Sequence, residues 1–388
     1  MGGFAKHMAH PYEYTDFTYK DIVELINELF NEHIEFKEKL DGFNIMSTMN
    51  NEGEVVFIRN KGNINSIKGG MTLDELKEKY KGKDRQYKVF VKSAKLIQKA
   101  FNKLGKDYFN IDTNHRKVIN CECIISPCTN IINYYIDKIA FHGYKIFEFS
   151  NNEWIEIKDV EGDVDDIYEI CKKIKECQKR KKLTLDLSSY DREYLKEYFL
   201  KKLENIWKLR INKFDENNTI DDFFKLRFQQ EYCKFGNQDL DIYKRILYED
   251  KSVNLKELKK RYPDNIADIN ILDGEFGRYI KYKIIEDLDL FFLELGNILI
   301  QNIKGFENDY HKFQTIHDLK EKVKNVLDNH EPKDGPKLNR EINRLSYLNN
   351  QYNIAEGLVF VFKERKMKLT GSFSCINQIC GLNKYLEN

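Results

Sequence analysis

The sequence contains few prolines, no long apolar run and no excess of either charge. Only 5 of its 388 residues are proline, which beside abundant Lys, Asn, Ile and Tyr is typical of an AT-rich genome. No run of about 18 apolar residues that could cross a membrane is present, and residues 1–10 lack the apolar core of a signal peptide. We therefore expect a protein without membrane contact that stays in the cytoplasm, the host cytoplasm if the chain is viral.

Cysteine is present, but not in a pattern that binds zinc. Among the 8 cysteines the pairs Cys121/Cys123 and Cys171/Cys177 have neither the spacing nor the companion ligands of a zinc site. We predict reduced thiols that are buried, since free cysteine is among the most buried residue types.

Charge is balanced in number, with 64 basic and 63 acidic residues. Balanced totals exclude no class of partner, because the two signs can be segregated in space. Two basic runs stand out, one within residues 172–182 and one over residues 259–262. Such runs are usually solvated helix faces, and the functional alternative is a surface that follows phosphates.

The spacing of apolar residues predicts an α+β protein. Residues 21–29 have helical spacing, whereas 43–49 and 54–59 are strand-like runs on either side of the turn Asn50-Asn51-Glu52-Gly53, which predicts an antiparallel hairpin. Further elements are expected at 88–104 (helix) and at 118–125, 138–142, 144–149 and 154–157 (strands).

The order of the elements indicates one domain interrupted by another. From about residue 164 to 347 nearly every window is helical and densely charged, and strands return at 357–363 and 366–370. An interrupted domain explains this order better than three domains in series. We therefore predict a core over 1–160, a mostly α-helical insertion over 161–349 and the last core strands over 350–388, with strands from both ends in one sheet.

The sharpest local signal is Glu38-Lys39-Leu40-Asp41-Gly42. Alone it is weak, because a surface turn can carry these residues by chance. Other segments follow it in order: Arg59-Asn60-Lys61-Gly62, Glu122 within an apolar strand, Glu356-Gly357 and Lys366-Met367-Lys368. An ordered set is far more specific than any single match.

This ordered set resembles the motifs of the covalent nucleotidyltransferase superfamily, which includes ATP-dependent DNA and RNA ligases and mRNA capping enzymes. The resemblance implies a ligase core of ATP-grasp-like antiparallel sheets, with ATP and Mg²⁺ as cofactors. It implies that Lys39 forms a lysyl-AMP phosphoramide and that Lys366 and Lys368 act with it in catalysis. The nucleotide-binding residues that it implies are Asp41, Gly42, Asn44, Arg59, Phe141 as the aromatic that stacks on adenine, Glu122 and Glu356.

These residue types suit that chemistry. An amine attacks only when it is deprotonated and the ordinary pKa of Lys is about 10.4, so we expect burial and the cations Lys366 and Lys368 to lower the pKa of Lys39. The same cations would neutralise charge on the α-phosphate. Glu122 and Glu356 could hold a Mg²⁺ ion that keeps waters and phosphate as its other ligands. Gly42 and Gly357 would let the backbone approach the nucleotide closely.

A second resemblance lies at the two ends of the chain. The segments 7–13, 69–72 and 368–373 are similar to those of ligase-like proteins found in large tailed phages. This similarity supports the AMP chemistry better than the joining step. His7 and His10 could bind a metal or a phosphate, although two histidines at this spacing near a terminus are more often helix-cap or packing residues.

The substrate is less well defined than the AMP chemistry. Only 20 residues follow Lys368, too few for the barrel of about five strands that ligases of nicked DNA usually carry, so RNA is slightly favoured over DNA. The partner would be RNA or DNA ends or nicks. Two alternatives are a nucleotidyltransferase that passes AMP or GMP to an RNA end, a small molecule or a protein, and a non-catalytic nucleic-acid-binding relative. The sequence does not decide the oligomeric state.

Overall fold

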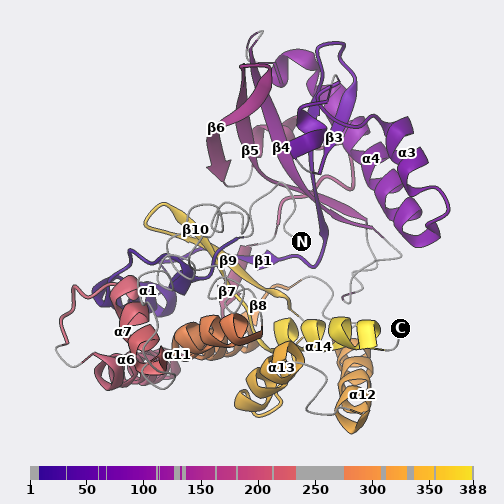
Figure 1. Ribbon diagram of the computed structural model, residues 1–388. Helices are drawn as coiled ribbons and strands as arrows, with labels where there is room; N and C mark the ends of the chain where they lie inside the picture. The colour runs from indigo at the N-terminus through magenta and orange to yellow at the C-terminus, as the bar shows by residue number, and fades with distance from the viewer. Residues whose placement is uncertain are drawn as a thin grey trace, which may run out of the picture.

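Two antiparallel sheets form the framework of the chain (Figure 1). The structure is a computed structural model, and it describes residues 8–31, 33–59, 61–66, 68–110, 112, 114–125, 132, 137–161, 164–180, 182–211, 214–232, 275–306, 312–329, 336–353 and 355–386. The first sheet contains, in spatial order, β10 (Arg365–Leu369), β9 (Gly357–Phe362), β1 (Phe36–Lys39), β7 (Lys182–Leu185) and β8 (Ile303–Lys304). The second contains β3 (Val55–Ile58), β2 (Phe43–Met49), β4 (His115–Ile124), β5 (Lys138–Ser150) and β6 (Glu153–Glu161). The α+β class is therefore confirmed.

Helices cover the outer sides of both sheets. The second sheet and the helices α3 and α4 form the upper lobe in Figure 1, and the first sheet lies below it with most of the other helices. The helices with the bounds seen in the structure are η1 (Pro11–Glu13), α1 (Tyr19–Phe30), α2 (Lys61–Ile64), α3 (Leu73–Tyr80), α4 (Asp84–Leu104), η2 (Lys106–Tyr108), α5 (Asp165–Cys171), α6 (Ser189–Arg210), α7 (Ile220–Tyr232), α11 (Glu275–Gln301), α12 (Lys312–Asn329), α13 (Pro336–Tyr347) and α14 (Ser372–Leu386).

The second sheet contains the hairpin that the sequence predicts. β2 and β3 pair with Met46 opposite Ile58, and the side-chain oxygen of Asn50 accepts hydrogen bonds from the backbone N–H groups of Glu52 and Glu54. Gly53 completes the turn at φ 79°, a conformation that glycine adopts without strain. The hairpin prediction is thus confirmed.

One face of the second sheet packs on α4, and the other does not. Along β4 the side chains of Cys121 and Cys123 lie in the core shared with α4, together with Ile97 and Phe101. Because side chains alternate along a strand, Glu122 lies on the opposite face. Both thiols are buried and free, as predicted.

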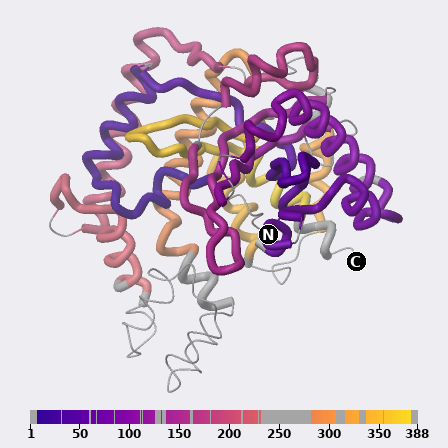
Figure 2. The backbone as a smooth tube through the Cα atoms, turned by 90° about the horizontal axis from the view of Figure 1, so that it is seen from above, coloured from indigo at the N-terminus to yellow at the C-terminus, as the bar shows by residue number. Residues whose placement is uncertain are grey.

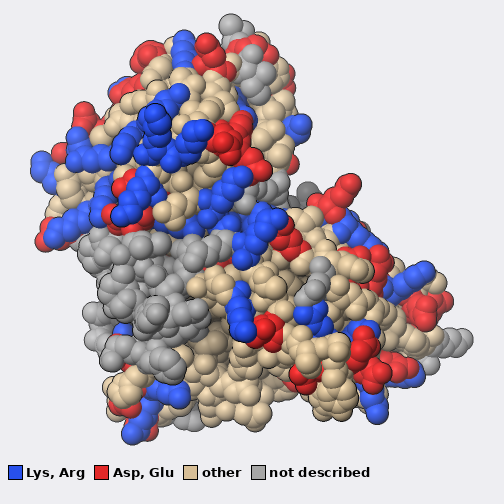
Figure 3. Space-filling view, turned by 180° about the vertical axis from the view of Figure 1, so that it is seen from behind, with Lys and Arg blue, Asp and Glu red and all other residues tan. Residues whose placement is uncertain are grey.

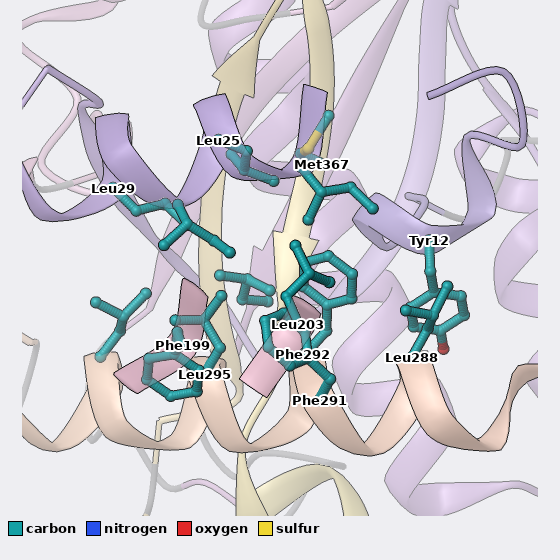
Figure 4. Close-up of a cluster of buried hydrophobic side chains, with 14 of the residues drawn as sticks. Tyr12, Leu25, Leu29, Phe199, Leu203, Leu288, Phe291, Phe292, Leu295 and Met367 are labelled. Carbon is teal, nitrogen blue, oxygen red and sulfur yellow. The ribbon is translucent and has the colours of Figure 1, made fainter. Parts of the chain in front are cut away.

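The first sheet unites segments from distant parts of the chain. β1 pairs with β9, so that Lys37 lies opposite Val359, and the strands near the two ends of the chain lie side by side, as expected (Figure 2). Below the sheet α1, α6 and α11 bury a common core around Leu25, Phe199 and Phe291, residues that are fully buried (Figure 4). The carboxylate of Asp21 and the hydroxyl of Thr18 form a capping box that begins α1.

The range 161–349 is not made of helices alone. β7 and β8, two short strands inside it, extend the first sheet beyond β1, with Phe36 opposite Leu183 and Leu185 opposite Ile303. Its helices α6, α7 and α11 share one core with α1, β9 and β10. These three helices agree with the helical character that the sequence predicts between about residues 164 and 347, of which residues 233–274 lie outside the described residues. After β10 the chain forms α14.

Within the part of the chain that the structure describes, no helix combines the length and the apolar character needed to span a membrane.

Candidate active site

Lys39 lies where the chain passes from one sheet to the other. It is the last residue of β1 in the first sheet and lies opposite Gly357, while Phe43 begins β2 in the second sheet. Only Leu40-Asp41-Gly42 separate the two strands. Lys39 is therefore part of the link between the two sheets.

The amine of Lys39 is held by carboxylates. Its Nζ donates a hydrogen bond to Oε1 of Glu356, which immediately precedes β9. Burial alone would lower the pKa of Lys39, but the charges of Glu356, Glu122 and Asp41 outweigh it and raise that pKa above its ordinary value. The expected lowering of the Lys39 pKa is therefore wrong for this arrangement, in which the side chain is an ammonium.

Glu122 reaches the same cluster from the second sheet. Its Oε2 lies 2.9 Å from Nε2 of His142, a residue of the neighbouring strand β5. Asn44 lies opposite Glu122 on β2 and donates a hydrogen bond to Asn120. Although burial opposes ionisation of Glu122, the hydrogen bond from His142 and the positive charges of Lys39 and Arg180 hold its pKa below the usual range.

Gly42 makes room for the Glu122 side chain. A Cβ at position 42 would lie 2.8 Å from Cγ of Glu122 and 2.9 Å from the carbonyl oxygen of Cys123, closer than Cβ atoms approach other groups. A Cβ on Gly357 would meet the carbonyl oxygen of Leu369 at 2.4 Å. Both glycines thus allow close approach within the protein itself, and Gly42 is the one that places a carboxylate of the cluster.

On the AMP chemistry that the resemblance implies, we expect Gly42→Ala to lower the rate of AMP attachment by at least about tenfold, because displacing a reacting group by about 1 Å costs up to a hundredfold in rate. The measurement is the time course of the protein's mass increase with ATP and magnesium. Gly381→Ala is the matched control, since nothing lies within 4 Å of a Cβ at that position. Equal rates for Gly42→Ala and Gly381→Ala would show that the Glu122 position is unimportant.

The two late lysines, Lys366 and Lys368, extend towards the carboxylate cluster from β10. Lys366 donates from Nζ to the backbone carbonyl of His142 at 3.2 Å, and Lys368 is buried two residues further along the strand. Burial, followed by the positive charge of Lys39, lowers the pKa of Lys368 to about 8. Both late lysines thus belong to the cluster, as the sequence predicts.

The segment before η1 runs beside β10. The backbone N–H of Lys368 donates to the carbonyl oxygen of Ala9 at 3.0 Å. The ring of His10 stacks on that of Tyr12 with centroids 5.3 Å apart, which agrees with a packing role, whereas His7 lies outside the described residues. The start of the described chain therefore flanks the strand that carries Lys368.

Phe141 and Arg59, which the resemblance implies as nucleotide contacts, lie away from the carboxylate cluster. Phe141 is fully buried among Phe101 and Tyr168 on the α4 side of the second sheet, the face opposite Glu122, so its ring is not available to stack on adenine. Arg59 lies over the ring of Phe90 at 4.6 Å and donates to the hydroxyl of Tyr80 at 2.9 Å. The alternation along β5 and β3 directs both side chains away from the carboxylate cluster.

His142 and Arg180 are site residues that sequence reasoning missed. The ring of His142 lies on the same face of the second sheet as Glu122. Arg180 is buried close enough for its charge to lower the pKa of both Glu122 and His142. A polar residue next to Phe141 in an apolar strand was the available signal for His142. Arg180 could not be singled out within its basic run.

The carboxylates suit a magnesium ion better than a transition metal. Glu122 and Glu356 are hard oxygen ligands from separate strands, and Oε2 of Glu356 is a buried atom without a hydrogen-bond partner. Among the residues that the structure describes, no group of three or more His, Cys, Asp or Glu side chains is arranged to hold a metal. This donor set fits an ion that keeps most of its own waters.

The pH dependence of stability provides a test of the buried His142. Burial, then the charge of Arg180, lowers its pKa from 6.5 to about 4 despite Glu122. Because its pKa is lower in the folded protein, His142 is protonated in the unfolded chain at a higher pH than in the folded one. The contribution of the neutral ring to the free energy of unfolding is therefore complete above about pH 6.5. It is lost as pH falls towards 4, by up to about 3 kcal/mol. Glu356, whose pKa burial raises to about 7, acts in the opposite sense.

The test therefore compares how steeply the free energy of unfolding of two proteins falls with pH. Urea unfolding of the wild type and of His142→Gln from pH 7 to pH 4 is expected to show a smaller acid loss in the variant. Parallel curves would mean that folding does not change the pKa of His142.

Comparison with protein-family models, with curated proteins and with solved structures finds no match to this chain.

Proposed function

We propose that the protein is an ATP-dependent polynucleotide ligase of the covalent nucleotidyltransferase superfamily, acting through a lysyl-AMP intermediate at Lys39. RNA is slightly favoured over DNA as the strand that is joined. The observation that supports this proposal is the meeting of Lys39, Glu122, Glu356 and Lys368, which lie far apart in the sequence. A surface turn or a purely structural ion pair has no need of all four charges in one place.

The residues suit transfer of AMP to an amine. Attack by Nζ of Lys39 on the α-phosphorus forms a nitrogen–phosphorus bond and releases pyrophosphate. The proton that Nζ loses can pass by way of Oε1 of Glu356, which Nζ contacts, to water, so that Glu356 stays ionised as a magnesium ligand. The ammonium groups of Lys366 and Lys368 would stabilise negative charge on the phosphate oxygens. Magnesium held by Glu122 and Glu356 would supply further positive charge there.

The test is a mass spectrum of the purified protein after incubation with ATP and magnesium, with the modified peptide located. We expect an increase of one AMP on the peptide that contains Lys39, and a smaller increase or none with GTP. A panel of nicked RNA, nicked DNA and tRNA ends then identifies the acceptor. Protein that gains no nucleotide from ATP or GTP would overturn the proposal in favour of a non-catalytic nucleic-acid-binding relative.

A second candidate is transfer of AMP or GMP to another acceptor, namely an RNA end, a small molecule or a protein. The observation in its favour is α14, which occupies the residues after β10 where a ligase of nicked DNA would continue into its barrel. Nucleotide on Lys39 without any joined strand would support this candidate.

A further inference from the structure

The outer face of α4 is a stripe of lysines. Between residues 84 and 106 the chain has seven basic residues and one acidic residue. Five of these lysines are exposed and recur at helical spacing, so they share the face that points away from the sheet. They are Lys88, Lys92, Lys95, Lys99 and Lys103. The stripe is about 22 Å long at 1.5 Å per residue.

A second basic segment lies beside this helix. Residues 171–182 contain seven basic residues and one acidic residue, and Lys172, Lys173 and Lys175 are exposed. The segment begins against α4, where the thiol of Cys171 donates to the carbonyl oxygen of Ala100 at 3.6 Å. The two segments together hold 14 basic and 2 acidic residues, a net charge of +12, so the rest of the chain carries −11. A total of +1 therefore conceals a strong segregation of charge.

Most lysines of the α4 stripe are not compensated locally, whereas Lys179 and Lys182 of the second segment pair with Asp165 and Glu35. Lys88, Lys95, Lys99 and Lys103 form no ion pair with any residue that the structure describes. On α6, by contrast, basic and acidic residues alternate and pair, as Lys196 does with Glu193 at 2.6 Å. A solvated helix face usually resembles α6, because paired charges offset their mutual repulsion. In the view from behind, Lys and Arg side chains gather over the lobe that contains α3 and α4 and over its junction with the rest of the molecule (Figure 3).

The second basic segment connects the stripe to the candidate active site. The backbone of Cys177 forms an isolated β-bridge with that of Ile139 on β5. Arg180 is buried near Glu122. Lys182 lies opposite Lys37 on β1. Basic residues therefore continue from the outer face of α4 to within two residues of Lys39 along β1, where Lys182 and Lys37 share the carboxylate of Glu35.

We propose that the α4 lysine stripe and residues 172–182 bind the sugar–phosphate backbone of a polynucleotide and lead it to Lys39. The inference rests on the proposed function in naming the substrate that the site receives. An anionic membrane fits less well, because a helix that lies on a membrane exposes apolar residues beside its cations. The apolar residues of α4, such as Ile97 and Phe101, are instead buried against the second sheet.

The test compares two triple variants in binding a short labelled single-stranded RNA and the corresponding duplex over a range of salt. In the first, Lys95, Lys99 and Lys103 of α4 are replaced by glutamine; in the control, Lys320, Lys322 and Lys324, which are exposed on α12, are replaced in the same way. We expect the α4 variant to lose about tenfold or more in affinity at low salt. Its slope of log K against log salt should be smaller by about 2, since each lost contact with a single strand changes that slope by about 0.7.

The mass increase with ATP in the absence of nucleic acid is measured on the same samples, so that a failure of the binding surface is distinct from a failure of the proposed chemistry. We expect both triple variants to take up AMP as the wild type does. Equal affinities for the two triple variants would overturn the inference. So would binding to phosphatidylserine vesicles, but not to RNA or DNA, that is lost in the α4 variant.

Discussion

Lys39→Ala is expected to abolish the attachment of AMP, with a loss of at least about a thousandfold in rate, because no other nucleophile can replace an amine that forms the covalent bond. The side chain points at a carboxylate rather than into the core, so its removal should leave the fold intact. The measurement is the mass of the protein after incubation with ATP and magnesium, with circular dichroism to establish that the variant is folded.

Lys37→Ala is the matched control. Lys37 lies on the same strand two residues earlier, opposite Val359, and its Nζ lies 3.4 Å from a carboxylate oxygen of Glu35. We expect this variant to take up AMP as the wild type does. If Lys39→Ala still gained AMP, or if both variants lost it equally, the nucleophile would have to be sought elsewhere in the chain.

Asp289→Ala is expected to destabilise the protein by about 3–5 kcal/mol, the range found when one partner of a buried ion pair is removed. Asp289 of α11 is buried, and its Oδ2 lies 3.0 Å from Nε of Arg344 on α13. Its Oδ1 accepts a hydrogen bond from the hydroxyl of Tyr12 at 2.8 Å. Without this carboxylate the Arg344 guanidinium stays buried with Glu341 alone, at 2.8 Å.

The free energy of unfolding in urea measures this loss. Glu193→Ala removes the partner of an ion pair on α6 whose carboxylate is largely exposed, and a change below about 0.5 kcal/mol is expected there. An Asp289→Ala protein that unfolds within 1 kcal/mol of the Glu193→Ala protein would show that Arg344 finds compensation in water or in Glu341.

Five charged residues of the site could be predicted because chemistry, not packing, dictates their types, whereas Arg180 was missed. An ordered set of a lysine, two glutamates and two late lysines pointed to one cluster, and the structure brings these side chains together. The hairpin was equally readable, since its turn residues are consecutive in the sequence. The activity itself stays a proposal.

The predictions that failed are those that depend on which face of a strand a side chain occupies, or on very short strands. Phe141 and His142 are neighbours, and only the pairing of β5 with β4, which shifts register between Asn120 and Cys121, decides which of them faces Glu122. β7 and β8 are too short for a period of two to be visible inside a helical sequence. The pKa of Lys39 could not be anticipated either, because it depends on which of the surrounding charges lies nearest.

The hydrogen bond between Lys39 and Glu356 joins residues that are 317 positions apart in the sequence. During synthesis from the N-terminus Lys39, the proposed nucleophile, leaves the ribosome long before its carboxylate partner and before β9 and β10 exist. A nascent chain should therefore not react with ATP until β9 and β10 have been made. Contacts of such long range form slowly, so the appearance of AMP-bound protein in a timed translation reaction would report the last stage of folding.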